Sequence, residues 1–527
     1  MIIVDPVCAR PWRCLAVLLL LAIAGCANRD AVVSFPTRSP PPFSASGKMV
    51  SPDRWWTTFD DSGLDQQINQ ALGGSFTLAA ALQRLRAARA LARREASDLW
   101  PDVDGVADIG SVFGPGDNRT VFTSGLDTSY QVDLWGQIES QVQAERQRAA
   151  ATQADYHVVA LTLSAEVART WFALKESHAQ MALLDEQLEI NRTGLSLQEF
   201  RFGQGLVRSA DVLRQRQLVE STLEQVVIVK ARIEVLEHQL AVLLGQPPQQ
   251  ATYVTGAELP ALPPLPATGL PSELLNRRPD VRRDYLAFMA ADRDLASAIT
   301  AQYPRLSLSG SVLNIADRPE AVFRDWFVSI GGQLIGPLID GGERRAEVDR
   351  TTAVVRQRFN EYGQTMLNAF REVEDSLALE RYQIERIGRL EKQVELARQS
   401  SEQLREQYVL TDDTDYLNVL SAITTQQRLQ RETLSARLQL ILIRIGLYLA
   451  LAGDFDPCPQ GILGFQDDPL LLEEPPSESE NGSPQADELP ELEATPETLP
   501  LPEPDGPSEL EQSLSQLNGP PGIIVDE

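Results

Sequence analysis

The feature that most restricts the fold of this chain is an internal duplication. The segment RREASDLWPDVDGVADIGS around Pro101 resembles DLASAITAQYPRLSLSGS around Pro304. In both, a helical pattern is followed by an aromatic residue, a proline and then alternating polar and apolar residues. Long helical patterns follow both segments. Their apolar positions share one spacing, at Leu161, Ala165, Ala168 and Phe172 and again at Met366, Phe370, Val373 and Leu377. Self-similarity of this kind indicates two copies of one structural unit.

Each copy contains two alternating segments with the pattern of a β-hairpin. Residues 102–113 and 120–133 form the first pair, joined by the turn GPGDN, and residues 305–315 and 325–339 form the second. Such segments are long enough to span a membrane. The alternative is a half-buried sheet in a soluble domain, because alternation is weak evidence for any one strand.

Four strands cannot close a barrel, and open sheet edges are not tolerated in lipid. The membrane interpretation therefore requires several chains. Three chains of four strands would supply twelve, an even number as in bacterial barrels. The sequence does not itself count the subunits.

A long helical pattern follows each hairpin, at residues 137–200 and 343–407. At 1.5 Å per residue, such a helix extends roughly 96 Å. Arg, Glu and Gln fill the positions between the apolar stripes, as in coiled coils packed in water. Polar turns follow, and return helices are expected at 209–244 and 415–451, where Gly and Pro signals end them.

The N-terminus has the pattern of a bacterial lipoprotein signal. Arg10 and Arg13 precede the run LAVLLLLAIAG, which is too short for a stable membrane anchor. Ala24 and Gly25 before Cys26 resemble a lipobox, which implies a diacylglycerol and an N-acyl lipid on Cys26. Asn28, in place of the aspartate that often retains lipoproteins in the inner membrane, favours the outer membrane. The alternative is an ordinary signal peptide with an incidental cysteine.

Composition excludes several other classes. The mature chain keeps only Cys26 and Cys458, so a lipidated Cys26 leaves no intramolecular disulfide. The three histidines are scattered, and we find no metal-site pattern and expect no other cofactor. The net charge of −27 argues against nucleic-acid binding, which needs basic patches. Much of that charge lies in a Pro- and Glu-rich tail that is predicted to be disordered and solvated.

These patterns predict an α+β membrane protein with two structural repeats, in which a barrel built from several chains, four strands per chain, is joined to long coiled-coil helices; three chains would make it a trimeric twelve-stranded barrel. We divide the chain into a signal peptide (1–25), a lipidated N-terminal segment (26–60), a first repeat (61–255), a Pro-rich linker (256–271), a second repeat (272–456) and the acidic tail (457–527).

The chain resembles the outer-membrane efflux lipoproteins of the TolC, OprM and NodT type over roughly residues 55–453. The resemblance rests on the order and spacing of the lipobox, YQVDLWGQ, LSAEVARTWFAL, RFGQGLVRSADVL, LLNRRPDVRRD, YPRLSLSG, IDGGERR, LNAFREVEDSL and DYLNVL. It implies a homotrimeric channel, lipid-anchored in the outer membrane of a Gram-negative bacterium, whose barrel continues as a helical tunnel across the periplasm. It also implies two partners, a periplasmic adaptor (membrane fusion) protein and an inner-membrane transporter of the resistance-nodulation-division type, in a tripartite system that exports drugs or other small molecules.

The resemblance also assigns roles to residues at the helical turns. Asp415 matches the aspartate that lines the periplasmic gate of the family, and Asp412 and Asp413 add charge nearby. Asp412 replaces the usual turn glycine, which puts the turn geometry in question. Rings of aspartates would favour cations. The competing interpretation is that these are solvated turn residues and helix N-caps.

By the same resemblance, the first turn is the surface met by the adaptor, with contacts at Gly205, Leu206, Val207 and Ser209. Residues at the strand-to-helix junctions have structural roles, since glycine permits backbone angles that other residues avoid. Gln137 departs from the basic residue usual in the family. The junction residues are Asp133, Trp135, Gly136, Gly341 and Gly342.

Three other functions compete with the efflux channel. A periplasmic coiled-coil scaffold or adaptor would share the lipobox and the helices, but it would not need two amphipathic hairpins. A type I secretion exit duct remains open within the channel class. An enzyme is not expected, because no nucleophile elbow, phosphate loop or metal spacing is present.

Overall fold

The structure is a computed structural model of the chain that describes residues 41–49, 52–114, 117–248, 253, 256, 258–321, 324–410 and 415–451. Cys26, Asp412, Asp413 and the acidic tail lie outside the described residues.

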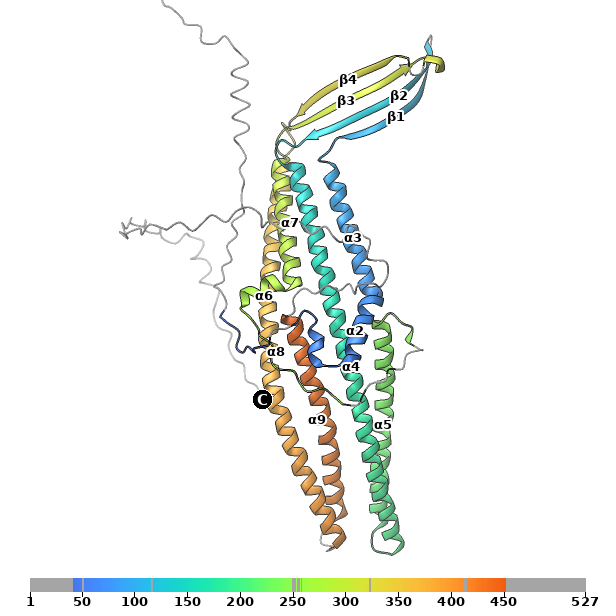
Figure 1. Cartoon of the computed structure of the whole chain (residues 1–527), viewed down its shortest axis with the longest axis vertical. Helices are drawn as coiled ribbons and strands as arrows, with labels where there is room; N and C mark the ends of the chain where they lie inside the picture. Colours follow the sequence, from blue (N-terminus) through green and yellow to red (C-terminus); the bar gives the residue numbers. More distant parts are fainter. Residues whose placement is uncertain are drawn as a thin grey trace, which may run out of the picture. The chain divides into compact units, whose positions relative to one another are not determined.

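The described residues form two successive sets of helices and strands in the order that the duplication predicts (Figure 1). The first set comprises η1 (Trp55–Phe59), α2 (Ser62–Gly74), α3 (Phe76–Ser97), β1 (Asp102–Gly114), β2 (Asp117–Val132), α4 (Gln137–Gly203) and α5 (Ser209–Leu243). The second comprises α6 (Pro271–Arg277), α7 (Pro279–Thr300), β3 (Arg305–Ala316), η3 (Pro319–Ala321), β4 (Trp326–Ile335), α8 (Glu343–Leu410) and α9 (Tyr416–Leu451).

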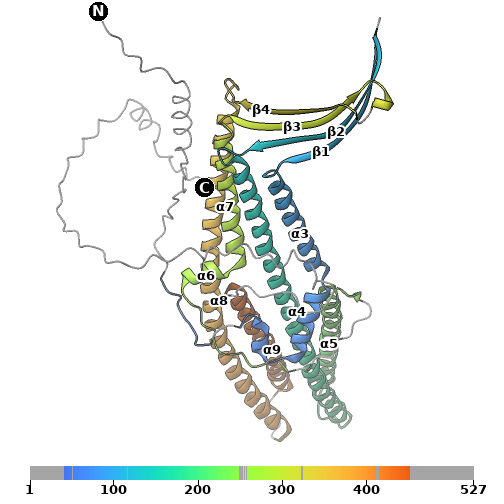
Figure 2. The same ribbon diagram turned by 45° about the horizontal axis from the view of Figure 1, so that its top comes forward.

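The four strands make one antiparallel sheet in the order β1-β2-β3-β4, curved along its length (Figure 2). Each predicted hairpin is present, and β2 pairs with β3 to join the two repeats. The last predicted strand was too long, because β4 ends at Ile335 and residues 336–339 are not in a strand. Pro337 lacks an N–H, and β3 begins at Arg305 opposite Ile335, so no strand of this chain lies beside that segment.

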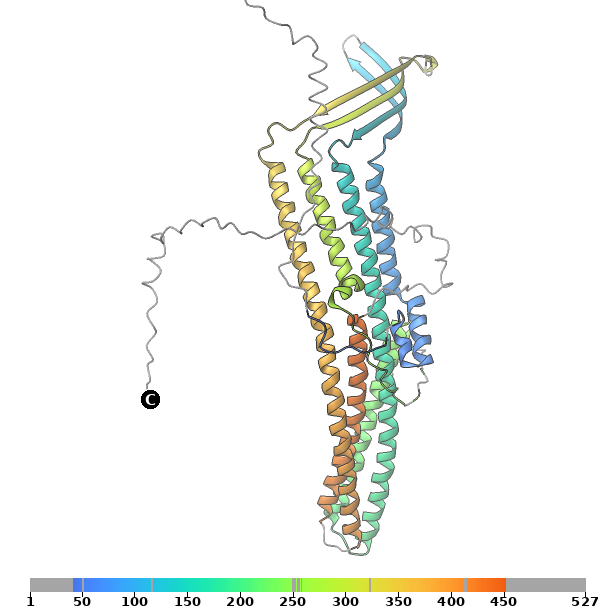
Figure 3. The same ribbon diagram turned by 60° about the vertical axis from the view of Figure 1, so that its left-hand side comes forward.

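The two longest helices have the lengths expected from the sequence, 67 residues for α4 and 68 for α8. α4 packs against α3 and α5 of its own repeat and against α7 and α9 of the other. The sheet lies at one end of α3, α4, α7 and α8, and the turn between α4 and α5 lies at the far end (Figure 3). The helices therefore separate the sheet from the turns.

The predicted apolar stripes form the core of the helices. Leu161, Ala165, Ala168 and Phe172 are buried in the first repeat, and Met366, Val373 and Leu377 occupy one buried cluster in the second. One helix of the described part, α9, is long and apolar enough to cross a membrane, but 56% of that apolar window is buried against other helices. This burial identifies α9 as a core helix.

A buried ion pair connects α8 and α9 in the second repeat. The Arg444 guanidinium on α9 donates to both carboxylate oxygens of Glu380 on α8, at 2.8 and 2.6 Å. It also donates to the carbonyls of Pro263 and Pro264 in the linker. Because Arg444, Glu380 and Pro263 are buried, the pair holds α8, α9 and the linker together.

Candidate functional site

One face of the sheet is largely apolar. The register places alternate residues of all four strands on that face, for example Ile109 opposite Phe122 and Val312 opposite Val328. Ile330, in the middle of β4, is 90% exposed. The other apolar residues on this face are Val103, Ala107, Leu126, Tyr130, Val132, Leu306, Leu308, Trp326 and Leu334. An exposed apolar surface of this size on a sheet is typical of contact with lipid.

The opposite face is mainly polar. Asp104 lies directly opposite Asp127, and Asp102 and Asp108 lie on the same face. Serines and glutamines continue the face over β3 and β4, at Ser307, Ser309, Ser311, Ser329 and Gln333. Like charges placed opposite each other destabilise a sheet unless water solvates them, so this face must meet water. The sheet therefore separates an apolar from an aqueous environment.

Both edges of the sheet are open within the described chain. β1 pairs only with β2, and β4 pairs only with β3. An open edge carries unpaired N–H and C=O groups, which lipid cannot satisfy.

The first strand-to-helix junction is ordered by the residues that the sequence singled out. Asp133 Oδ2 accepts a hydrogen bond from the Glu139 backbone N–H at 2.8 Å, beside the start of α4. Gly136 has φ of 73°, a left-handed conformation that favours glycine. Trp135 Nε1 donates to the Pro304 carbonyl at 2.7 Å, and its ring packs against Tyr303. Trp135 thereby joins the junctions of the two repeats.

The second junction repeats this arrangement with different residues. Gly341 and Gly342 have φ of 64° and 90°. The Gly342 N–H donates to Asp340 Oδ1 at 3.0 Å, and Arg344 donates to Asp340 Oδ2 and to the Ala301 carbonyl. Sequence reasoning missed Asp340 and Arg344, although the motif IDGGERR contains both.

The turn between α4 and α5 presents part of the expected tip surface. Gly205 has φ of 71°, and the Leu206 N–H donates to the Arg201 carbonyl at 2.9 Å, which closes the helix with a Schellman motif. Leu206 is 65% exposed, and Ser209 is also exposed. Val207 differs, because it packs inward against the buried cluster of Tyr408, Tyr416, Val419 and Ile423.

Asp415 lies at the first turn of α9 and is exposed. Its Oδ1 accepts a hydrogen bond from the Leu417 N–H at 3.1 Å, and its carbonyl accepts one from Asn418. Asp415 is thus an N-cap, as the competing interpretation expects, and the carboxylate stays accessible to solvent. A role in a gate remains a prediction.

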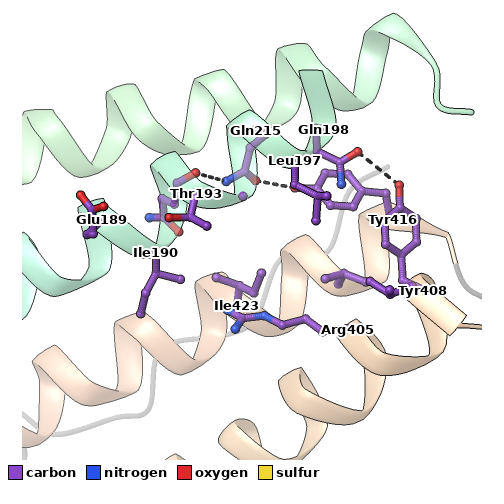
Figure 4. A pocket seen from close by; sticks show the side chains of 14 residues that line it. Glu189, Ile190, Thr193, Leu197, Gln198, Gln215, Arg405, Tyr408, Tyr416 and Ile423 are labelled. Carbon is purple, nitrogen blue, oxygen red and sulfur yellow. Dashed lines mark hydrogen bonds between the residues drawn. The ribbon is translucent and has the colours of Figure 1, made fainter. Parts of the chain in front are cut away.

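Near these turns, tyrosines on the second repeat contact glutamines on the first (Figure 4). The Tyr408 hydroxyl donates to Gln198, and the Tyr416 hydroxyl donates to Gln215. Burial raises the pKa of the Tyr416 hydroxyl, so it stays protonated as a donor. A cavity of about 340 Å³ lies beside these tyrosines, bounded by α4, α5, α8 and α9.

Further from the turns, α4 and α9 meet through buried amide side chains. Asn191 and Gln427 exchange hydrogen bonds at 3.3 and 3.0 Å, and Arg431 donates to Gln187. This polar contact was not predicted from the sequence, because these residues have the pattern of solvent-exposed polar positions between apolar stripes. Within the described ranges, no group of three or more His, Cys, Asp or Glu residues has the geometry of a metal site.

The comparison with known proteins agrees with this geometry. The family model for outer membrane efflux proteins matches residues 67–246 and 270–453. The chain is 30% identical to the pyoverdine export outer membrane protein OpmQ of Pseudomonas aeruginosa over 442 residues, which cover 80% of this chain and 92% of OpmQ. It is 26% identical to the cation efflux system protein CusC of Escherichia coli O6:H1, over 84% of this chain and 99% of CusC.

Among solved structures, the fold is similar to that of the outer-membrane channel OprN, with a TM-score of 0.73 and 29% sequence identity. The match covers 80% of this chain and 99% of the OprN chain. The chain belongs to the outer membrane efflux protein family. It is an efflux channel protein of the outer membrane, and its fold of four strands and long helices in two repeats is the one expected from the sequence.

Proposed function

We propose that three copies of this chain close one barrel and act as the exit duct of a tripartite efflux system. The observation that carries the proposal is the sheet, which has one apolar face, one polar face and two open edges. Such a sheet is stable in lipid only when its edges pair with other strands. Three copies supply twelve strands, and the polar faces then line an aqueous lumen.

Surfaces on the helices support the same assembly. α5 contacts α4 extensively but touches other helices little. Its outward side exposes Ile228, Val235 and Val242, which follow one another at the seven-residue spacing of a coiled-coil seam. A helix of a neighbouring copy would cover this seam, so that the helices continue the barrel as a tunnel through the periplasm.

Cys26 supplies the lipid anchor in this proposal, carrying a diacylglycerol and an N-acyl chain. The support is the lipobox in the sequence and the outer-membrane location of the family. Two or more acyl chains give stable anchoring, whereas a single chain gives marginal binding.

The partners are a periplasmic adaptor and an inner-membrane transporter. The adaptor would bind at the helical turns. Leu206 and Ser209 are exposed at the turn between α4 and α5, where an adaptor can reach them. Asp415, together with Asp412 and Asp413, would form the cation-favouring constriction at the same end. The cargo is a small molecule, and the chain acts as a conduit without enzymatic activity.

The experiment is an efflux assay in the native host after deletion of this gene. Complementation with wild type is expected to restore low ethidium accumulation, and C26S is expected to restore it less well while losing palmitate label. L206D is expected to insert normally but to leave ethidium accumulation high, whereas the control L213D, on exposed α5 surface, is expected to complement. Full complementation by L206D would contradict the adaptor surface, and unchanged accumulation after gene deletion would contradict the efflux role.

A further inference from the structure

The cavity beside Tyr408 and Tyr416 has the size and the lining of a small-molecule site (Figure 4). Its volume is about 340 Å³, within the range of about 300–1,000 Å³ that is usual for ligand sites. Apolar and aromatic side chains form most of its wall, with a small number of polar groups, as in such sites. The aliphatic residues of the wall are Ile190, Leu197, Val409, Val419 and Ile423.

The aromatic part of the wall is held in place by both helical hairpins. The rings of Tyr408 and Tyr416 lie with their centroids 5.2 Å apart. The Tyr416 hydroxyl donates to Gln215 on α5, and the Arg201 guanidinium on α4 lies 4.5 Å from the centroid of the Tyr408 ring. Because these contacts fix the tyrosines, the cavity is formed before any ligand binds, which lowers the cost of binding.

One charged group enters the wall without a partner. Arg405, on α8, is half-buried, and none of the residues that the structure describes forms a hydrogen bond or an ion pair with its guanidinium. Burial is the main cause of the raised pKa of the Tyr416 hydroxyl, and the Arg405 charge acts in the opposite direction, so Arg405 lies near the aromatic wall. A half-buried cation without a counter-ion is unfavourable, and an anion beside it would be stabilised.

The acidic residue that lines the same cavity does not compensate this charge. Glu189 lies on α4 and is exposed, so water solvates and screens its carboxylate. Figure 4 shows Glu189 and Arg405 on different walls of the cavity. The site therefore favours an anionic ligand over a cationic one.

We propose that this cavity binds a small anionic amphiphile, whose apolar body lies against Leu197, Val419 and Ile423 and whose carboxylate pairs with Arg405. The site is distinct from the exposed turn residue Leu206, and the proposal does not depend on the exit-duct function. Because both hairpins line the cavity, a bound molecule stabilises the arrangement in which they lie together.

Isothermal titration calorimetry tests the site, with the full lipidated chain in lipid nanodiscs and empty nanodiscs as the blank. The probes are 4-phenylbutyrate, 4-phenylbutanol and 4-phenylbutylamine, which share an apolar body and differ in charge. At pH 7, 4-phenylbutyrate is expected to bind saturably at one site per chain. 4-Phenylbutanol is expected to bind about tenfold more weakly, and 4-phenylbutylamine is expected not to bind measurably.

Two variants with matched controls place the probe in the cavity. R405Q is expected to weaken 4-phenylbutyrate binding about tenfold and to leave 4-phenylbutanol binding unchanged, whereas R389Q, at an exposed arginine of α8 outside the cavity, is expected to bind like wild type. L197W puts a larger side chain at the rim and is expected to abolish binding of both probes. L213W, at an exposed leucine of α5 outside the cavity, is expected to have no effect. Circular dichroism checks that each variant is folded.

Each contrary result would overturn a defined part of the proposal. Absence of saturable 4-phenylbutyrate binding to folded wild type would show that the cavity takes no such ligand, as when a neighbouring copy fills it. Binding that L197W leaves unchanged would place the ligand outside the cavity. Equal binding of the three probes, or no effect of R405Q, would overturn the pairing with Arg405. None of these results bears on transport, so the proposed exit duct is tested separately.

Discussion

At the scale of single residues, glycines set where backbones approach closely or turn. Gly125 in β2 is the sharpest case in the sheet, because a Cβ added there would lie 2.0 Å from the Val312 carbonyl oxygen. Its φ of 157° is also unusual for residues with a side chain. Gly105, on the neighbouring strand, has nothing within 4 Å of its would-be Cβ.

The substitution G125A is expected to destabilise the sheet by about 1–3 kcal/mol, because the contact is with rigid backbone. Thermal unfolding in detergent, followed by circular dichroism, measures the effect. The matched variant G105A is expected to leave the midpoint almost unchanged. Equal midpoints for G125A and wild type would show that β2 and β3 lie further apart than the structure describes.

A second residue-scale prediction concerns Asp61, the N-cap of α2. Burial raises its pKa, but hydrogen bonds from Lys175, Trp171 and the Leu64 N–H outweigh burial and lower the pKa below 3.8. Because the pKa is lower in the folded state, the ionised carboxylate stabilises the fold at pH values above the pKa of the unfolded state. This stabilisation is lost as the pH falls through the pKa of the folded state. D61N is therefore expected to lose about 2 kcal/mol at neutral pH.

The pH dependence and a neighbouring aspartate provide the controls. The difference in the free energy of unfolding between wild type and D61N is expected to disappear as the pH falls below about 4. Burial and nearby carboxylates raise the pKa of Asp65, so D65N is expected to be neutral or stabilising at pH 7. Urea unfolding of the three proteins at several pH values measures both effects, and a constant difference between wild type and D61N across pH would contradict the account.

At the scale of elements, the periodicity of the sequence predicted which segments form strands and which form helices. The hairpins and the long helices followed from alternation and from apolar stripes, and the register places Val103, Ala107 and Ile109 on one face. The length of β4 was overestimated because apolar residues, Leu338 and Ile339, continue past Ile335, while strand pairing depends on a neighbouring strand. Periodicity reports side-chain faces and carries no information about partners.

Contacts between distant segments could not be predicted in this way. The N-terminal segment contacts the second repeat through the Ser44 N–H, which donates to Glu374 at 2.8 Å. It contacts the linker through its Met49 carbonyl, which accepts a hydrogen bond from the Ala267 N–H. The sequence does not distinguish Gln187 and Asn191 from solvent-exposed polar residues, because only the fold reveals that their side chains are buried. Val207 was expected on the outer tip surface but packs inward, since a turn motif does not state which side faces the neighbouring hairpin.

At the scale of the whole molecule, the two faces of the sheet separate lipid from water. Ile330 and Ser329 are adjacent in β4 and lie on opposite faces. I330R is expected to reduce stability in the membrane by about 2–4 kcal/mol, as for basic residues at the middle of a lipid-facing strand. S329R, which would face the lumen, is expected to insert normally. Refolding titrations in lipid vesicles measure both, and equal losses in the two variants would contradict the assignment of the faces.

The central claim is that the assembled chain forms a channel, and conductance in planar bilayers tests it most directly. Wild type is expected to give small, discrete, cation-selective steps. D415N is expected to give larger and less selective steps, because asparagine keeps a capping side chain on α9 and removes the charge. Folded, membrane-inserted protein that conducts in neither form would contradict the account.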